Sequence, residues 1–285
     1  MGSPPGAVRI VTDTTACLDD SYLREHHVES VPQVILFGEE SYLEQVEMGC
    51  EEFLRRLRAS PVLPRTAAPP PGEFVTAYGR QLEHAATILS IHPSSEVSGT
   101  VRSALTAREE SFPGADIRVL DTRTVAGPLA SMVRMAVEWN EGGVPTDEIM
   151  RRLETRIPRS RAYFAVGTLE YLRRGGRIGG ASALLGSALQ IKPLLQLQHG
   201  KVEPLEKVRT HHRALERLKA LTLEHCPREG EPWLCVMHGD LSEEAQELAV
   251  DLGTEFGLPD VPIYRLGAAI STHVGPETLA VGFFV

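Results

Sequence analysis

The chain has 285 residues, of which 42% are hydrophobic and 24% charged, so it has room for one large domain or two modest ones and is not disordered throughout. Its formal net charge is −9, and it contains no run of five or more basic residues, which argues against a nucleic-acid-binding protein.

The four cysteines, Cys17, Cys50, Cys226 and Cys235, include no CxxC pair. We therefore expect no zinc or iron–sulfur site built on thiolates, and no other metal site. The first residues lack the basic-then-apolar layout of a signal peptide, and no run of 18 apolar residues exists. We expect a cytoplasmic protein with free thiols and no transmembrane segment, whose contact with a membrane would at most be transient.

The first half of the chain alternates between strand-like and helix-like segments. Strands are predicted over residues 8–11, 28–37, 86–92 and 117–120, and helices over 19–26, 49–59, 72–84, 101–112, 126–141 and 146–156. Five prolines between residues 61 and 72 forbid a helix there and favour an extended loop. The alternation predicts an α/β fold with a mainly parallel sheet, in which ligands bind at the carboxyl ends of the strands. That edge would hold residues 12–15, 93–100 and 121–124.

The pattern changes after Pro158, where hairpins mix with helices. Strands are predicted over residues 163–166, 234–237, 263–266 and 279–285, a hairpin over 192–208, and helices over 169–174, 181–189, 210–224 and 242–256. Residues 181–189 are small and apolar almost all round, which is typical of a fully buried helix. We predict a second, α+β domain with a mixed sheet, so that the domains are residues 1–158 and 159–285.

The turn after the predicted strand over 86–92 is rich in hydroxyls. Ser94, Ser95, Ser98, Gly99 and Thr100 lie within seven residues, just before a helix. Hydroxyls and free backbone N–H groups at a helix N-terminus bind anions; the alternative is that one serine simply caps the helix. Neither a GxGxxG nor a GxxxxGK[ST] motif follows a strand, so no nucleotide-binding loop is expected.

Three further groups of residues have a functional and a structural interpretation. Ser98 could be a hydrolase nucleophile, but the G-x-S-x-G elbow needs glycine where Glu96 stands. His273, predicted in a loop before the last strand, is either a hydrogen-bond donor or base, or a surface histidine. Arg173, Arg174 and Arg177 would suit a carboxylate or phosphate, or would simply end a helix.

These segments together resemble the DegV family, whose members include the fatty-acid-binding subunits of bacterial fatty-acid kinase. The resemblance runs from Ile10-Val-Thr-Asp-Thr-Thr15 to His273-Val-Gly-Pro276, and its most specific segment is Leu169-Glu-Tyr-Leu-Arg-Arg-Gly-Gly-Arg-Ile178, continuing through Ile191-Lys-Pro-Leu-Leu195. It implies two α/β domains that hold a fatty acid between them. It also implies that the carboxylate is bound by Thr66, Ser98, the backbone of Gly99, and His273.

The resemblance implies a lipid-binding protein that presents its fatty acid to a separate kinase and is not itself an enzyme. The surface near Arg173, Arg174 and Arg177 would face that kinase, and no cofactor is implied. The alternative is a stand-alone hydrolase or acyltransferase that uses Ser98 and His273. Two segments depart from the family pattern, Ala67-Ala68-Pro69-Pro70 and Ala126-Gly127-Pro128. We expect the first departure to remove one polar partner from the proline-rich loop. We expect the second to alter the lining of the acyl tunnel, and with it the preferred chain length.

Overall fold

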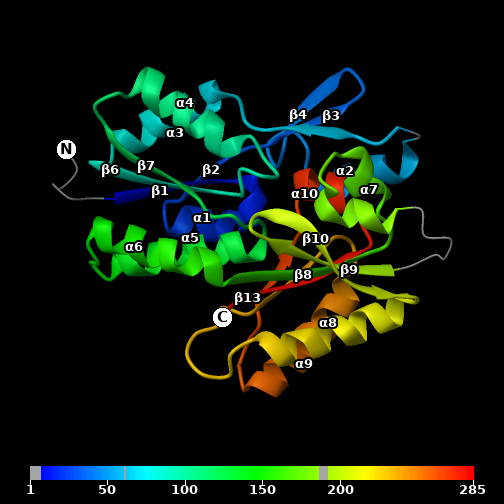
Figure 1. Cartoon of the computed structure of the whole chain (residues 1–285). Helices are drawn as coiled ribbons and strands as arrows, with labels where there is room; N and C mark the ends of the chain where they lie inside the picture. The colour runs from blue at the N-terminus through cyan, green and yellow to red at the C-terminus, as the bar shows by residue number, and fades with distance from the viewer. Residues whose placement is uncertain (1–7, 61, 186–191) are drawn as a thin grey trace.

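In the computed structural model, described for residues 8–60, 62–185 and 192–285, the first half of the chain forms a parallel sheet (Figure 1). Its strand order is β2-β1-β6-β7, and every pairing in it is parallel. The strands are β1 (Val8–Asp13), β2 (Glu29–Val31), β6 (Thr87–His92) and β7 (Asp116–Asp121). The predicted α/β class is confirmed.

A mixed sheet of six strands follows in the second half. Its order is β10-β9-β8-β13-β11-β12, and only the pair of β11 and β12 is parallel. The strands are β8 (Ser160–Val166), β9 (Lys192–Gln198), β10 (Lys201–Val208), β11 (Cys235–His238), β12 (Ile263–Arg265) and β13 (Thr278–Phe284). The predicted hairpin is β9 and β10. The boundary between two domains near residue 158 stays a prediction.

Helices stack with the two sheets into layers (Figure 1). α3 (Pro71–Leu82) and α4 (Thr100–Ser111) cover one face of the parallel sheet, and α8 (His211–His225) and α9 (Ser242–Phe256) cover the outer face of the mixed sheet. α5 (Gly127–Glu141) packs between the sheets, beside α6 (Thr146–Arg156). Side-chain alternation fixes this order, because Ile88 packs with α3 and α4 whereas its neighbour Leu89 packs with α5.

The position of α5 explains its sequence. The first half of α5, between the two sheets, has no solvent-facing side and is buried at every residue from Gly127 to Val133, whereas Glu138 and Glu141 near its end are exposed. Its first turn approaches β11 so closely that a Cβ on Gly127 would lie 2.5 Å from Cys235 Sγ. Glycine at the start of α5 therefore allows the two sheets to share one layer of side chains.

A third, small sheet was not predicted. The expected single strand over 28–37 divides at Pro32 into β2 and β3 (Val34–Phe37), which belong to different sheets. β3 pairs with β4 (Glu40–Leu43) and with β5 (Arg65–Ala67), a strand inside the proline-rich segment. α2 (Cys50–Ala59) and α10 (Ala268–Val274) pack beside this sheet. Prediction by local pattern failed here because each strand is too short to show alternation.

Two further predictions need correction. His273 lies on α10 and not in a loop. The predicted buried helix over 181–189 is, in its described part, a 3₁₀ helix over Gly179–Leu184 that exposes Ser182 and Ala183, and residues 186–189 lie outside the described residues. Ile191 also lies outside them. The short helix after Leu169 is confirmed as α7 (Glu170–Arg174). Among the described helices, none is long and apolar enough to span a bilayer.

The shared layer gives a stability prediction. Leu129 on α5 is 0% exposed and belongs to the core between the sheets. Leu129→Ala should lower the free energy of unfolding by about 2–5 kcal/mol, because it leaves a cavity that rigid sheets cannot fill. Val250→Ala on the exposed face of α9 should change it by less than about 0.5 kcal/mol. Urea denaturation of both variants measures the difference, and equal effects would show that α5 is not the common core.

Candidate functional site

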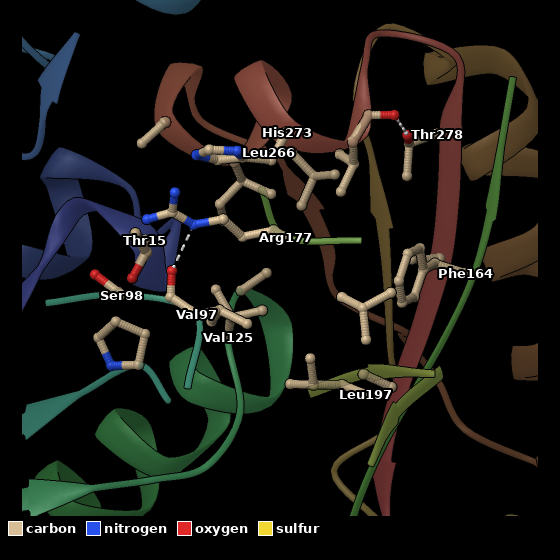
Figure 2. A pocket seen from close by; sticks show the side chains of 18 of the residues that line it. Thr15, Val97, Ser98, Val125, Phe164, Arg177, Leu197, Leu266, His273 and Thr278 are labelled. Carbon is tan, nitrogen blue, oxygen red and sulfur yellow. Dashed lines mark hydrogen bonds between the residues drawn. The ribbon is translucent and has the colours of Figure 1, made fainter. Parts of the chain in front are cut away.

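A cavity lies where the two sheets and α10 meet; its space, together with the open solvent at its mouth, is about 950 Å³. Its walls come from both halves of the chain. Apolar side chains make most of the lining, among them Val125, Phe164, Leu197, Val202, Leu266 and Val274. Polar side chains line it too, namely Thr15, Gln33, Thr66, Ser98, Arg177, His273 and Thr278. Figure 2 shows Thr15, Ser98, Arg177 and His273 gathered on one side of the view, with Phe164 and Leu197 on the other.

Three of the predicted carboxylate ligands line this cavity together. Thr66 on β5 and His273 on α10 are 207 residues apart, yet Thr66 Oγ1 lies 2.8 Å from His273 Nε2. Ser98 lies in the turn between β6 and α4, and its Oγ is 2.7 Å from Thr100 Oγ1. The fourth, Gly99, precedes α4 and packs beside the proline-rich segment, where a Cβ would lie 3.4 Å from the Cβ of Ala68. The predicted edge of the sheet is therefore the polar end of the cavity.

His273 is held as a neutral ring. Burial lowers its pKa from 6.5 to about 4, and the nearby Arg177 charge acts in the same direction. Its Nδ1 is buried and has no hydrogen-bond partner among the described residues; it lies against Gly175, where a Cβ would be only 2.1 Å from that nitrogen. A glycine at 175 is thus required for the imidazole to fit. The tautomer with its proton on Nε2 avoids a buried donor without an acceptor and directs the N–H toward Thr66.

The three arginines of the predicted cluster lie in two different places. Arg177 turns toward the cavity, where its Nε donates to the carbonyl of Val97 at 3.0 Å and its Nη1 to the carbonyl of Gly175 at 2.8 Å. Figure 2 shows its guanidinium between His273 and Ser98. Arg173 and Arg174 lie outside on α7 and both pair with Glu170, with about half of each side chain exposed. Only Arg177 is placed to meet an anion in the cavity.

A buried polar network under the site was not predicted from the sequence. Asp13, which ends β1, accepts a hydrogen bond from His92 on β6, with 2.8 Å between Oδ2 and Nδ1 and both side chains fully buried. His92 Nε2 is 2.6 Å from Ser90 Oγ, which in turn is 2.7 Å from the Tyr78 hydroxyl. The available signal was positional, since Asp13 and His92 are the last residues of two strands that are neighbours in a parallel sheet.

A second buried carboxylate positions the helix that carries His273. Glu44 is 1% exposed, and its Oε1 accepts from the backbone N–H of Ala269 in α10 at 2.8 Å. Its other oxygen accepts from the hydroxyl of Thr14. Burial raises the pKa of Glu44, while both hydrogen bonds favour the ionised form. Glu44 therefore ties α10 to the end of β1, on which the polar network rests.

The lowered pKa of His273 predicts how stability depends on pH. As the pH falls, the unfolded chain takes up a proton near pH 6.5 and the folded protein only near pH 4. Acidification across that window therefore favours unfolding, at a cost on the order of 3 kcal/mol. His273→Gln, which keeps a donor for Thr66 but has no proton to gain, should lose less stability between pH 7 and pH 4. Urea denaturation at each pH tests this, and parallel curves for the two proteins would contradict it.

Comparison with known proteins agrees with this geometry. A DegV domain-containing protein of Streptomyces coelicolor is 40% identical over 279 residues, which are 96% of this chain and 97% of the relative. A structure described as fatty acid binding of a DegV family protein from Thermus thermophilus superposes with a TM-score of 0.89 at 31% identity, covering 97% of this chain and 99% of that one. The structure of DegV, a fatty acid binding protein from Bacillus subtilis, gives a TM-score of 0.86 at 31% identity, covering 98% and 99%.

A model of the whole family also matches this chain. The family model described as "Uncharacterised protein, DegV family" covers residues 7–285, which includes both sheets and the whole lining of the cavity. Taken with the relatives above, this shows that the chain belongs to the DegV family.

Proposed function

We propose that this protein binds a long-chain free fatty acid in the cavity and presents its carboxylate to a separate ATP-dependent fatty-acid kinase. The observation that carries the proposal is one cavity with two chemically different ends. Thr66, Ser98 and His273 line the polar end, where Thr66 and His273 are in contact, and apolar side chains such as Phe164 and Leu197 form other walls. A carboxylate with an acyl tail is the class of ligand that needs both.

The energetics favour such a ligand. A carboxylate that leaves water must find replacement donors, because an unpaired buried charge is very costly. The hydroxyls of Thr66 and Ser98 supply donors, and the charge of Arg177 supplies a field of the right sign. The Nε2–H of His273 donates to Thr66 Oγ1 and so leaves the Thr66 proton for the carboxylate. Burying each methylene of the tail contributes about 0.8 kcal/mol, so that 14 methylenes give at most roughly 11 kcal/mol before ordering costs. The tail would supply most of the affinity, and the polar end would fix the orientation.

The relatives support the same ligand. The proteins from Thermus thermophilus and Bacillus subtilis are both described as fatty acid binding, and each covers nearly the whole of this chain at 31% identity. Their fold and this fold superpose closely. A binding role therefore requires no rearrangement of the chain.

The geometry favours binding over hydrolysis. A serine nucleophile needs a base within hydrogen-bond reach. Here His273 Nε2 is bonded to Thr66, and the hydrogen bonds of Ser98 go to Thr100. The Asp13–His92–Ser90 series has the right order for such a triad, but all three side chains are fully buried and none of them lines this cavity. The stand-alone hydrolase is therefore the less favoured function.

The proposed kinase step transfers the γ-phosphoryl group of ATP to a carboxylate oxygen, giving an acyl phosphate and ADP. The sequence offers no Walker-type phosphate loop, so the partner would supply the nucleotide site. Arg173 and Arg174 are exposed cations on a chain of net charge −9, close in sequence to the cavity residue Arg177. A local positive surface of this kind can steer an acidic partner toward the carboxylate end.

The departures from the family pattern fall on the cavity wall. Ala68 and Ala126 both line the cavity. Ala126 has a φ of 57°, a left-handed conformation that suits glycine better than alanine, and its N–H is held by the carbonyl of Thr15 at 3.0 Å. Each of these two residues presents only a methyl group to the cavity. We propose that these two side chains, with Pro128 behind them, set the preferred length of the acyl chain.

Substitution of Ser98 tests the carboxylate site. Ser98→Ala should weaken fatty-acid binding by roughly 10- to 100-fold, because a hydrogen bond to a charged group contributes about 1.5–3 kcal/mol. His273→Ala should act on the same carboxylate, so the double variant should lose less than the sum of the two single losses. Competition with a fluorescent fatty acid measures all four affinities. Strict additivity would place the two residues at separate sites, and an unchanged affinity of Ser98→Ala would remove Ser98 from the site.

Substitution of Arg173 tests the kinase surface. Arg173→Ala should leave fatty-acid affinity unchanged and slow acyl-phosphate formation by an added fatty-acid kinase, most strongly at low salt, because screening weakens a steering charge. Arg151→Ala is the matched control, since Arg151 pairs with Glu148 on α6 as Arg173 pairs with Glu170 on α7. Equal rates for both variants at every salt concentration would exclude Arg173 from docking.

A further inference from the structure

Gln33 joins the buried polar network to the cavity. It follows Pro32 in the short link between β2 and β3, is 3% exposed, and lines the cavity. Its Nε2 lies 3.0 Å from Asp13 Oδ1 and 2.9 Å from Thr100 Oγ1. One amide group therefore contacts both the buried carboxylate and the hydroxyl next to Ser98.

Asp13 fixes which way this amide faces. Its Oδ1 also accepts from the backbone N–H of Thr15 at 3.0 Å and from the Thr15 hydroxyl at 2.5 Å, and its Oδ2 accepts from His92. An ionised carboxylate only accepts hydrogen bonds, so the NH₂ group of Gln33 must point toward it. The second proton of that NH₂ group then points at Thr100 Oγ1. Both protons of the amide therefore take part in hydrogen bonds, one to Asp13 and one to Thr100.

The orientation of the Gln33 amide also fixes which hydroxyl donates and which accepts in the next two hydrogen bonds. Thr100 Oγ1 accepts from Gln33, which leaves its own proton for Ser98 Oγ at 2.7 Å. Ser98 Oγ also accepts from the backbone N–H of Thr100 at 3.3 Å. With both acceptor directions of Ser98 in use, its proton is left to point into the cavity. The series Gln33, Thr100, Ser98 thus has one direction of donation, and it ends at the ligand.

We propose that Gln33 is a positioning residue that makes Ser98 a hydrogen-bond donor to the bound head group, and so sets the preference of the cavity for a carboxylate over an uncharged head group. The inference rests on the proposed fatty-acid site. Gln33 acts through Thr100 and Ser98, and the proposed effect requires no direct contact between Gln33 and the ligand. Without the amide donor, Thr100 and Ser98 can exchange donor and acceptor roles, and Ser98 no longer offers its proton reliably.

The test compares two ligands of equal chain length, a fatty acid and the corresponding fatty alcohol. Gln33→Met keeps the size of the side chain and removes the donor. The ratio of acid to alcohol affinity should fall by about tenfold, the effect of one charge-assisted hydrogen bond. Affinity for the alcohol should change by less than about twofold, because the apolar walls that dominate its binding are intact. Thr100→Val interrupts the series one step later and should give the same fall in the ratio.

A buried hydroxyl outside the series provides the control. Thr122 is 0% exposed and donates to the carbonyl of His92 at 2.8 Å, but it does not line the cavity. Thr122→Val should leave the ratio unchanged, even where it lowers the melting temperature. An equal fall in the ratio for Thr122→Val would show that general loosening of this region is responsible, and would overturn the inference.

A double-mutant cycle separates this inference from the proposed function. If Gln33 acts through Ser98, Gln33→Met should have no further effect on the ratio in the Ser98→Ala background. Additive effects would mean that Gln33 meets the carboxylate directly, and would overturn the inference while leaving the fatty-acid site standing. A fall in the acid-to-alcohol ratio in Ser98→Ala, without a fall in Gln33→Met or Thr100→Val, would also overturn the inference and leave the fatty-acid site standing. Failure of the unaltered protein to prefer acid over alcohol would instead overturn the proposed function.

Discussion

A carboxylate can be removed from water only where protein donors replace the water that it loses, and the folded chain is built around one that meets this requirement. Asp13 is fully buried and accepts from Thr15, Gln33 and His92. These donors come from the end of β1, from the link between β2 and β3, and from the end of β6. Satisfying one charge therefore fixes three segments at the carboxyl edge of the parallel sheet, which is the edge that faces the cavity.

The apolar end of the cavity follows from the shared layer. Because α5 packs against both sheets, the two sheets face each other across a core of side chains and leave space where α5 begins. Val125 and Ala126 lie just before that helix, and Phe164 and Met237 come from the mixed sheet opposite. Glu44 completes the arrangement by holding α10, and with it His273, over the polar end. The fold thus places an apolar lining and a set of hydrogen-bond donors around one cavity.

The parallel sheet, and the edge of it that lines the cavity, could be predicted because buried parallel strands are continuous apolar runs, as residues 86–92 show. The position of Ser98 on the cavity wall could be predicted because a hydroxyl-rich turn before a helix is a local pattern. His273 is wrongly predicted in a loop, because α10 has only seven residues and includes Ser271 and Thr272, which weaken a helical pattern. The pairing of Asp13 with His92, and the strand that carries Thr66, could not be predicted, because these contacts join residues far apart along the chain.

Mass spectrometry tests most directly whether the cavity holds a free fatty acid without a covalent bond. The protein, incubated with a long-chain fatty acid and freed of excess, would be measured under native and then under denaturing conditions. We expect a native mass increased by one fatty acid, and the mass of the bare chain after denaturation. A native mass equal to that of the bare chain, from a protein that hydrolyses fatty-acid esters, would contradict it.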